Sequence, residues 1–272
     1  PNELPASLGV DDPNVLRVLL IGTDAYQAED KGRSDTMIVA QINLQTADVK
    51  LVSFLRDLYV KIPKHGSTRL NAAYIYGGEE LLKQTLENNF GVTVDRTVAV
   101  NFSLMVDVID RIGGVDVEIT ESERKQLNSI LKFYNARNGL AQSDGLVDGA
   151  GLVHLGGRQA LSFSRIRKID SDFQRTGRQQ KVLQAAFKRV RQLDALTLAA
   201  LVADLLPQIK TDFSLADVVA LIPVMFKLDN VAFAGLTVPV SGAYSDETVN
   251  GMMVLRPNLQ KNTAAIAAFL GE

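Results

Sequence analysis

Aspartates beside apolar segments are the first side chains of this chain whose placement suggests chemistry. Asp24 closely follows the apolar run Val15–Ile21, and Asp35 precedes the apolar segment Met37–Ile42. Two hard oxygen ligands and several waters suit Mg²⁺. If Asp24 and Asp35 converge, they could therefore hold a magnesium ion. The alternatives are a turn aspartate at Asp24 and a salt-bridged loop at Asp35.

Arginines accompany these aspartates. Arg33 lies two residues before Asp35, and Arg56-Asp57 follows the apolar segment Val49–Phe54. An arginine at the end of a buried strand needs an anionic partner, because an unpaired buried charge is costly. We expect that partner to be either Asp57 or a phosphate group of a ligand.

The densest basic segment spans residues 158–191, with ten Lys and Arg and only two acidic residues. Arg165 and Arg167 lie on one face if their stretch is extended. Guanidinium forks match phosphate oxygens, so a phosphate or pyrophosphate ligand is favoured. A solvated basic face and a nucleic-acid surface are the alternatives. We expect the two arginines to face inward, which argues against nucleic acid.

The helix expected after this pair begins with polar residues on its inward row. Arg175 and Gln179 lie one turn apart, with Arg178 beside them, and the row of Gln179 continues as Leu183 and Phe187. This pattern predicts that the first turns of the helix face a buried polar site. The N-terminus of a helix also favours anions.

Composition excludes several kinds of chemistry. The chain has no Cys and two His among 272 residues, which excludes disulfides, thiolate nucleophiles, Cys-ligated zinc and a His-rich metal site. We interpret His65 and His154 as structural or solvated. The net charge of −2 excludes a globally basic nucleic-acid binder. No apolar stretch reaches the ~18–20 residues needed to span a membrane.

Alternating strands and helices must position these side chains, and they predict an α/β sandwich with a mainly parallel or mixed sheet. We expect one domain over residues 14–272, after a polar, proline-containing linker at 1–13. Asn138–Gly157, with six Gly, is expected to be a long loop. Expected strands are Val15–Ile21, Met37–Ile42, Val49–Phe54, Tyr59–Ile62, Thr97–Asn101, Val115–Ile119 and Val231–Val238. Expected helices are Glu79–Phe90, Leu104–Ile112 capped by Ser103, a helix from the capping box Thr120-x-x-Glu123 to about Arg137, Gln174–Gln192, Thr197–Leu206, Ser214–Phe226 and Asn258–Leu270. Arg158–Arg167 is expected to be a short helix that runs into an extended segment.

An ordered set of segments over about residues 15–190 resembles the LytR–CpsA–Psr family of cell-wall phosphotransferases. The segments are Val18–Asp24, Arg33–Thr36, Leu51–Asp57, Arg69–Tyr74 with Gly77-Gly78, Ile112–Val117, Leu155–Leu161, Ser164–Lys168 and Asp172–Gln180. Two departures occur: Leu55-Arg56-Asp57-Leu58 replaces the usual Pro-Arg-Asp-Thr, and Gln174 replaces a usual Gly. Neither removes a charged residue.

The resemblance implies a transferase that moves a glycopolymer, such as teichoic acid or capsule, from a polyprenyl-pyrophosphate carrier to peptidoglycan. It implies an α/β/α sandwich with a central mixed sheet and an apolar lipid tunnel, which we expect between the sheet and the helices Glu79–Phe90 and Leu104–Ile112. It also implies a domain on the extracytoplasmic face of the bacterial membrane. We therefore expect a single membrane-spanning helix before the linker, and no nucleic-acid partner.

Site residues follow from the matching positions. The resemblance implies that Asp24 and Asp35 ligate Mg²⁺ or Mn²⁺. It implies a catalytic role for Arg56, Asp35 and Asp24. We expect Asp24 or Asp35 to accept the proton, with a metal-bound water as the alternative. The residues implied for pyrophosphate binding are Arg56, Arg165, Arg167, Arg175 and Gln179, with Arg33 and Arg178 as weaker members. The alternative function is a regulatory module that binds polyprenyl phosphate without turnover.

Overall fold

The computed structural model describes residues 3–24, 32–169, 171–227 and 231–271. The chain divides into two compact units. Unit 1 combines Pro1–Asn101 with Val202–Glu272, and unit 2 comprises Phe102–Leu201. Among the described residues, no helix has both the length and the apolarity needed to cross a membrane.

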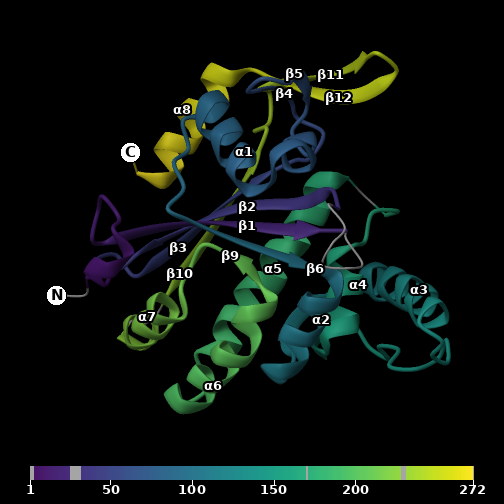
Figure 1. The fold of residues 1–272 in the computed structure, drawn as a ribbon. Helices are drawn as coiled ribbons and strands as arrows, with labels where there is room; N and C mark the ends of the chain where they lie inside the picture. The colour runs from purple at the N-terminus through teal and green to yellow at the C-terminus, as the bar shows by residue number, and fades with distance from the viewer. Residues whose placement is uncertain (1–2, 25–31, 170, 228–230, 272) are drawn as a thin grey trace. The chain divides into compact units, whose positions relative to one another are not determined.

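Unit 1 is built on a six-stranded sheet with the order β10-β3-β2-β1-β6-β9 (Figure 1). β1 pairs antiparallel with β2 and parallel with β6, and β3 pairs antiparallel with β2 and parallel with β10. The sheet is thus mixed, as the sequence predicted. Its strands are β1 (Val15–Thr23), β2 (Ser34–Asn43), β3 (Asp48–Phe54), β6 (Arg96–Asn101), β9 (Lys210–Thr211) and β10 (Ala232–Val238).

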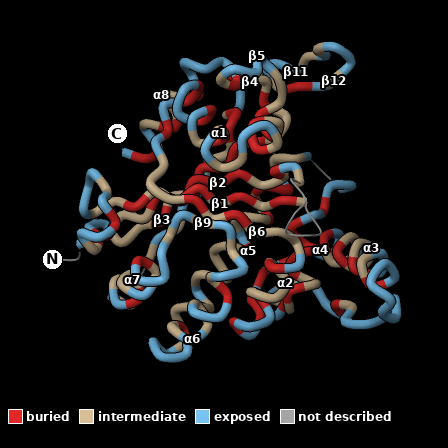
Figure 2. The backbone as a smooth tube through the Cα atoms, in the orientation of Figure 1, coloured by how far each residue is buried: buried red, intermediate tan, exposed pale blue. Residues whose placement is uncertain are grey.

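Helices cover both faces of this sheet, which confirms the α/β/α sandwich (Figure 1). On one face, α1 (Ala72–Phe90) packs against α8 (Leu259–Leu270), and α8 contacts β3 and β10. On the other face, α7 (Leu215–Lys227) joins an apolar cluster with Leu16 and Val18 of β1. The buried strands appear red in Figure 2, between tan and pale blue helices.

The start of unit 1 differs from the expected linker. Pro1 and Asn2 lie outside the described residues, but Leu4 and Leu8 are buried in the cluster that contains Leu16. A short 3₁₀ turn, η1 (Ala6–Leu8), brings Leu8 into this cluster. The sequence did not indicate this contribution to the core, because Leu4 and Leu8 are isolated apolar residues in a polar, proline-containing stretch.

Two small hairpins complete unit 1, and neither was predicted in full. β4 (Tyr59–Ile62) was expected, but its partner β5 (Gly66–Arg69) was not. The pair β11 (Tyr244–Val249) and β12 (Met252–Pro257) was missed entirely. The connecting residues Asn250 and Gly251 both have positive φ, which is the requirement of a type I′ hairpin turn.

Unit 2 is a group of helices around the hairpin of β7 (Val115–Ile119) and β8 (Gly151–Leu155). Its helices are α2 (Phe102–Arg111), α3 (Glu121–Arg137), α4 (Gly157–Ser164) and α5 (Asp172–Val190), and α6 (Ala195–Leu205) begins here and ends in unit 1. One apolar cluster, including Leu127, Phe163 and Val182, forms its core. The capping box at Thr120 and Glu123 is confirmed.

Two expectations for unit 2 were wrong. The segment Asn138–Gly157 is not one continuous loop, since it contains β8, which pairs antiparallel with β7. Glycines flank this strand, and its alternation of more and less buried residues is too short to be recognised in the sequence. Ser103 is not an N-cap either, because α2 begins at Phe102 and Ser103 lies inside it.

Candidate functional site

Asp24 directly follows β1, and Asp35 lies near the start of the neighbouring antiparallel strand β2 in unit 1. The register pairs Gly22 with Thr36 and Thr23 with Ser34, so Asp35 is the extra residue of a β-bulge. Bulges redirect a side chain at a sheet edge and are common beside active sites. β2 therefore begins earlier than predicted and presents Asp35 from a strand rather than from a loop.

Backbone contacts fix Asp24 at the end of β1. Its Oδ1 accepts the backbone N–H of Arg33 at 2.6 Å, and its own N–H donates to the Arg33 carbonyl at 3.2 Å. Gly22 allows the two strands to approach here, because a Cβ at this position would lie 3.0 Å from the Cβ of Thr36. The Arg33 side chain is exposed.

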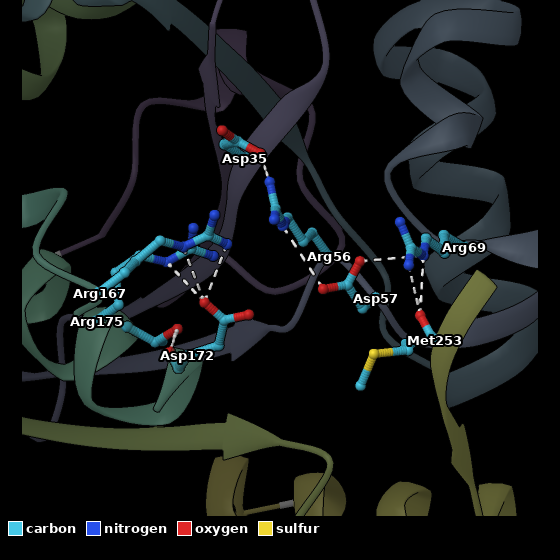
Figure 3. A network of polar contacts seen from close by, with 9 residues as sticks. Asp35, Arg56, Asp57, Arg69, Arg167, Asp172, Arg175 and Met253 are labelled. Carbon is cyan, nitrogen blue, oxygen red and sulfur yellow. Dashed lines mark hydrogen bonds and ion pairs between the residues drawn. The ribbon is translucent and has the colours of Figure 1, made fainter. Parts of the chain in front are cut away.

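Arg56 lies between two carboxylates in unit 1 (Figure 3). Its Nη1 lies 2.6 Å from Asp35 Oδ1, and its Nε lies 3.6 Å from Asp57 Oδ2. Arg69 continues the series, with Nε 3.2 Å from Asp57 Oδ1. Opposite charges thus alternate along Asp35, Arg56, Asp57 and Arg69. We call these four residues the unit 1 cluster.

The missed hairpin supports this cluster. The Leu255 N–H donates to the Asp57 carbonyl at 2.9 Å. Arg69 also donates from Nε and Nη2 to the carbonyl of Met253, at 3.1 and 2.6 Å (Figure 3). Arg69 is thus a site residue that sequence analysis did not assign, although the family segment Arg69–Tyr74 pointed to its position.

Unit 2 carries a second cluster, formed by Arg167, Asp172 and Arg175 (Figure 3). Arg167 Nε donates to Asp172 Oδ1 at 3.1 Å, and Arg175 Nε lies 3.6 Å from the same oxygen. Two guanidinium groups share one carboxylate, so these three side chains carry a net positive charge. Asp172 begins α5, and Ser171 caps that helix by accepting the N–H of Gln174. We call these three residues the unit 2 cluster.

Arg165 lies next to this cluster in the chain, and its guanidinium lies 4.5 Å from the centre of the Phe102 ring. The stretch is not extended at Arg165, whose φ is −101° and ψ 0°. Arg165 and Arg167 are both exposed, with buried Ile166 between them. The expectation that these two side chains face inward was therefore wrong.

Arg178 has a different place from that expected. Its side chain is buried, with Nε 2.8 Å from Glu123 Oε1 and Nη1 donating to the Ile166 carbonyl at 3.1 Å. Both partners lie inside unit 2 and hold the Arg178 side chain there, so we do not group Arg178 with the phosphate-binding candidates. Gln179 is half-buried on α5, one turn after Arg175.

The carboxylates at the bulge meet the requirements of a magnesium site only in part. Among the described residues, no group of three His, Asp or Glu side chains could hold a metal ion. Mg²⁺ is, however, commonly held by one or two carboxylates together with substrate phosphates and waters. Asp24 and Asp35 each use one oxygen in the chain, and a carboxylate can accept several bonds. An ion held by these two carboxylates would need phosphate oxygens and waters as its further ligands.

Comparison with known proteins identifies close relatives. Over 225 residues the chain is 32% identical to the polyisoprenyl-teichoic acid–peptidoglycan teichoic acid transferase TagT of Bacillus subtilis, covering 81% of this chain and 67% of that protein. The chain is also 36% identical over 183 residues to the transferase TagU of Bacillus anthracis, covering 66% of this chain and 54% of that protein.

Solved structures agree with this relationship. TagT bound to LIIa-WTA has a TM-score of 0.74 and 28% identity, covering 95% of this chain and 92% of that one. A LytR-CPS2A-psr family protein, YwtF (TagT), with bound octaprenyl pyrophosphate lipid, has a TM-score of 0.70 and 26% identity, covering 95% and 91%. The LytR_cpsA_psr family model matches residues 5–268. The chain therefore belongs to the LytR_cpsA_psr family.

Proposed function

We propose that this protein transfers a glycopolymer from a polyprenyl-pyrophosphate carrier to peptidoglycan. The observation that carries the proposal is the unit 1 cluster, in which Arg56 ends a buried strand between Asp35 and Asp57. Its relatives are named as teichoic acid transferases, and one related structure holds octaprenyl pyrophosphate. Teichoic acid is thus the first polymer to test.

The proposed chemistry is phosphoryl transfer. A hydroxyl of peptidoglycan attacks the phosphorus bonded to the glycopolymer, and a new O–P bond forms. The bond to the bridging oxygen breaks, so polyprenyl phosphate leaves with that oxygen. Such reactions depend on positioning and on neutralising the negative charge that develops in the transition state. Arginine side chains supply both the positioning and the neutralisation of charge, so the reaction requires no Cys or His.

We assign the phosphate-binding role to Arg56, Arg165, Arg167, Arg175 and Gln179, and a weaker role to exposed Arg33. The assignment rests on the family resemblance and on the charge of each cluster taken by itself. In the unit 2 cluster, Asp172 orders Arg167 and Arg175 without cancelling their combined charge. In the unit 1 cluster, Asp35 and Asp57 orient Arg56 from two sides.

Asp24 and Asp35 are the proposed residues for Mg²⁺ or Mn²⁺. A bound divalent cation would neutralise phosphate charge. The chain itself contributes the β-bulge that directs the Asp35 carboxylate. It also contributes the backbone contacts with Arg33 that hold Asp24 at the end of β1. Either carboxylate is also the proposed acceptor of the hydroxyl proton.

The lipid and the cellular location complete the proposal. We infer that an apolar tunnel in the fold holds the prenyl chain, because a protein of this family binds octaprenyl pyrophosphate. We also infer an extracytoplasmic domain attached to the membrane by a single helix, since peptidoglycan and the lipid carrier are both found there. No nucleic-acid partner is proposed.

The test is transfer from a polyprenyl-pyrophosphate-linked glycopolymer to peptidoglycan with added Mg²⁺. We expect Arg165→Ala and Asp35→Ala to abolish transfer while circular dichroism stays unchanged. Full activity in both variants would refute the site assignment. Retention of the lipid by the unmodified protein, with no release of polyprenyl phosphate, would instead support the regulatory alternative.

A further inference from the structure

We propose that Glu123 and Arg178 act as a positioning pair, which holds the segment between Arg165 and Arg167 in the conformation that binds phosphate. The inference rests on the proposed function, because it concerns the same two arginines. It assigns Arg178 to orientation of the site rather than to contact with the ligand.

The Arg178 guanidinium is bound on two sides. One part meets Glu123 Oε1 at 2.8 Å, and Nη1 donates to the Ile166 carbonyl at 3.1 Å. That carbonyl belongs to the peptide unit between Ile166 and Arg167. A single buried side chain on α5 thus contacts the backbone that carries the exposed arginines.

Ile166 is fixed from several directions. Its side chain is fully buried in the core of unit 2, and its N–H donates to the Phe163 carbonyl at 3.3 Å. The bond from Arg178 adds the remaining backbone group. With Ile166 held, Arg165 and Arg167 project from defined points, and Phe102 and Asp172 orient their guanidinium groups.

The two carboxylate oxygens of Glu123 have separate partners. Oε2 accepts the Thr120 N–H at 2.8 Å and so completes the cap of α3, whereas Oε1 is paired with Arg178. A cap alone needs no buried partner on another helix. Buried ion pairs add little net stability over apolar contacts, and specifying a conformation is a role they are known to serve.

Arg189 provides a matched comparison on the same helix. Its Nε donates to the Ile112 carbonyl at 2.9 Å, so it also links α5 to a backbone carbonyl. Ile112 follows α2, however, and lies far in the chain from Arg165 and Arg167. Arg189→Lys therefore controls for the general effect of replacing an arginine on α5.

The experiment compares Arg178→Lys with Arg189→Lys. Lysine keeps the positive charge but cannot reach Glu123 and the Ile166 carbonyl with the same two-sided geometry. Binding of octaprenyl pyrophosphate and of inorganic pyrophosphate is measured by calorimetry, together with thermal unfolding. We expect Arg178→Lys to weaken binding about 10- to 100-fold, the usual effect of losing a group that orients a site. We expect Arg189→Lys to stay within about twofold of the unmodified protein.

Amide hydrogen exchange of residues 165–169 provides a readout that does not need the ligand. We expect faster exchange in this segment for Arg178→Lys, but not for Arg189→Lys. If Arg178→Lys does not fold, Glu123→Gln is measured in the same way, because it keeps an oxygen for the Thr120 cap.

The outcomes separate the two proposals. Failure of the unmodified protein to bind either pyrophosphate would refute the proposed function, and hydrogen exchange would still test the positioning of Ile166. Normal binding and exchange in Arg178→Lys would overturn the positioning pair. So would equal losses of affinity in Arg178→Lys and Arg189→Lys at equal thermal stability.

Discussion

At the scale of single residues, the structure shows how the chain keeps arginines near each other and oriented. In the unit 1 cluster every guanidinium has a carboxylate neighbour, and these ion pairs are partly exposed. Partly exposed pairs contribute little to stability, about 0–1 kcal/mol. Their value lies in orientation, so their loss should affect ligand binding more than folding.

Arg56→Gln tests this difference. The substitution removes the charge between Asp35 and Asp57, and leaves two carboxylates facing the incoming phosphates. We expect binding of octaprenyl pyrophosphate to weaken by about 1.5–3 kcal/mol, the usual contribution of a hydrogen bond to a charged group. Calorimetry measures this loss, and thermal unfolding should change little.

Arg256→Gln is the matched control for this prediction. Arg256 belongs to unit 1, lies 2.6 Å from Glu247 and stacks over Tyr59, so its replacement removes the same charge from the same unit. An equal loss of binding in Arg256→Gln would show a general charge effect and contradict a specific role for Arg56.

At the scale of elements, local signals in the sequence predicted some features and missed others for physical reasons. The strand Val15–Ile21 was recognisable as a nearly continuous apolar run, and Val115–Ile119 as an alternation of apolar and acidic residues. β8 escaped notice because glycines flank it and its apolar residues need β7 as a partner. The Asn250-Gly251 turn was a recognisable hairpin signal, and it would have led to β12 and its contacts with Asp57.

The candidate site shows the same division. Asp35 and Arg56 were candidates because charged residues beside apolar segments are visible in the sequence, and Arg175 was a candidate because of its helical spacing with Gln179. The bulge at Asp35 was not visible, because it depends on the register of β2 against β1. The partners of Arg178 were hidden as well, since Glu123 lies 55 residues away and reads locally as part of a helix cap.

The Glu123–Arg178 pair makes a prediction for the stability of unit 2 as a function of pH. Burial opposes ionisation of Glu123, but hydrogen bonds from Thr120 and Arg178 outweigh it and lower the pKa of the carboxyl below its ordinary value of 4.5. A lowered pKa in the folded state stabilises the protein above the ordinary pKa, and this contribution is lost as the pH falls through the folded-state pKa.

Glu123→Gln should therefore destabilise the protein most near neutral pH, by about 3 kcal/mol, the lower end of the cost of breaking a buried pair. The difference from the unmodified protein should shrink as the pH falls from about 6 towards 3. Urea unfolding at several pH values measures this. Exposed Glu121→Gln, in the same turn of α3, is the control. A difference that stays constant with pH would contradict the assigned ionisation.

At the scale of the whole chain, a net charge of −2 conceals a strong separation of charge along the sequence. The basic residues of 158–191 bind partners of several kinds: Arg178 meets a buried carboxylate, Arg189 a backbone carbonyl, and Arg167 the exposed Asp172. Only part of the segment is thus available to a ligand. This selective exposure favours a small anionic headgroup over a long polyanion, which would need a continuous basic surface.

At the same scale, we predict that the protein retains the proposed lipid during purification. Each buried CH₂ contributes about 0.8 kcal/mol, so a long prenyl chain enclosed by apolar side chains should dissociate slowly. Protein purified from a bacterial host should therefore release polyprenyl phosphate or pyrophosphate on extraction with organic solvent, detected by mass spectrometry. The Arg56→Gln variant should retain less lipid than the Arg256→Gln variant, because contacts with the headgroup add to the affinity for the prenyl chain. A lipid site would be contradicted if delipidated protein failed to take up octaprenyl pyrophosphate. The site would be linked to transfer if the protein took up this lipid and released octaprenyl monophosphate only when a peptidoglycan acceptor was present.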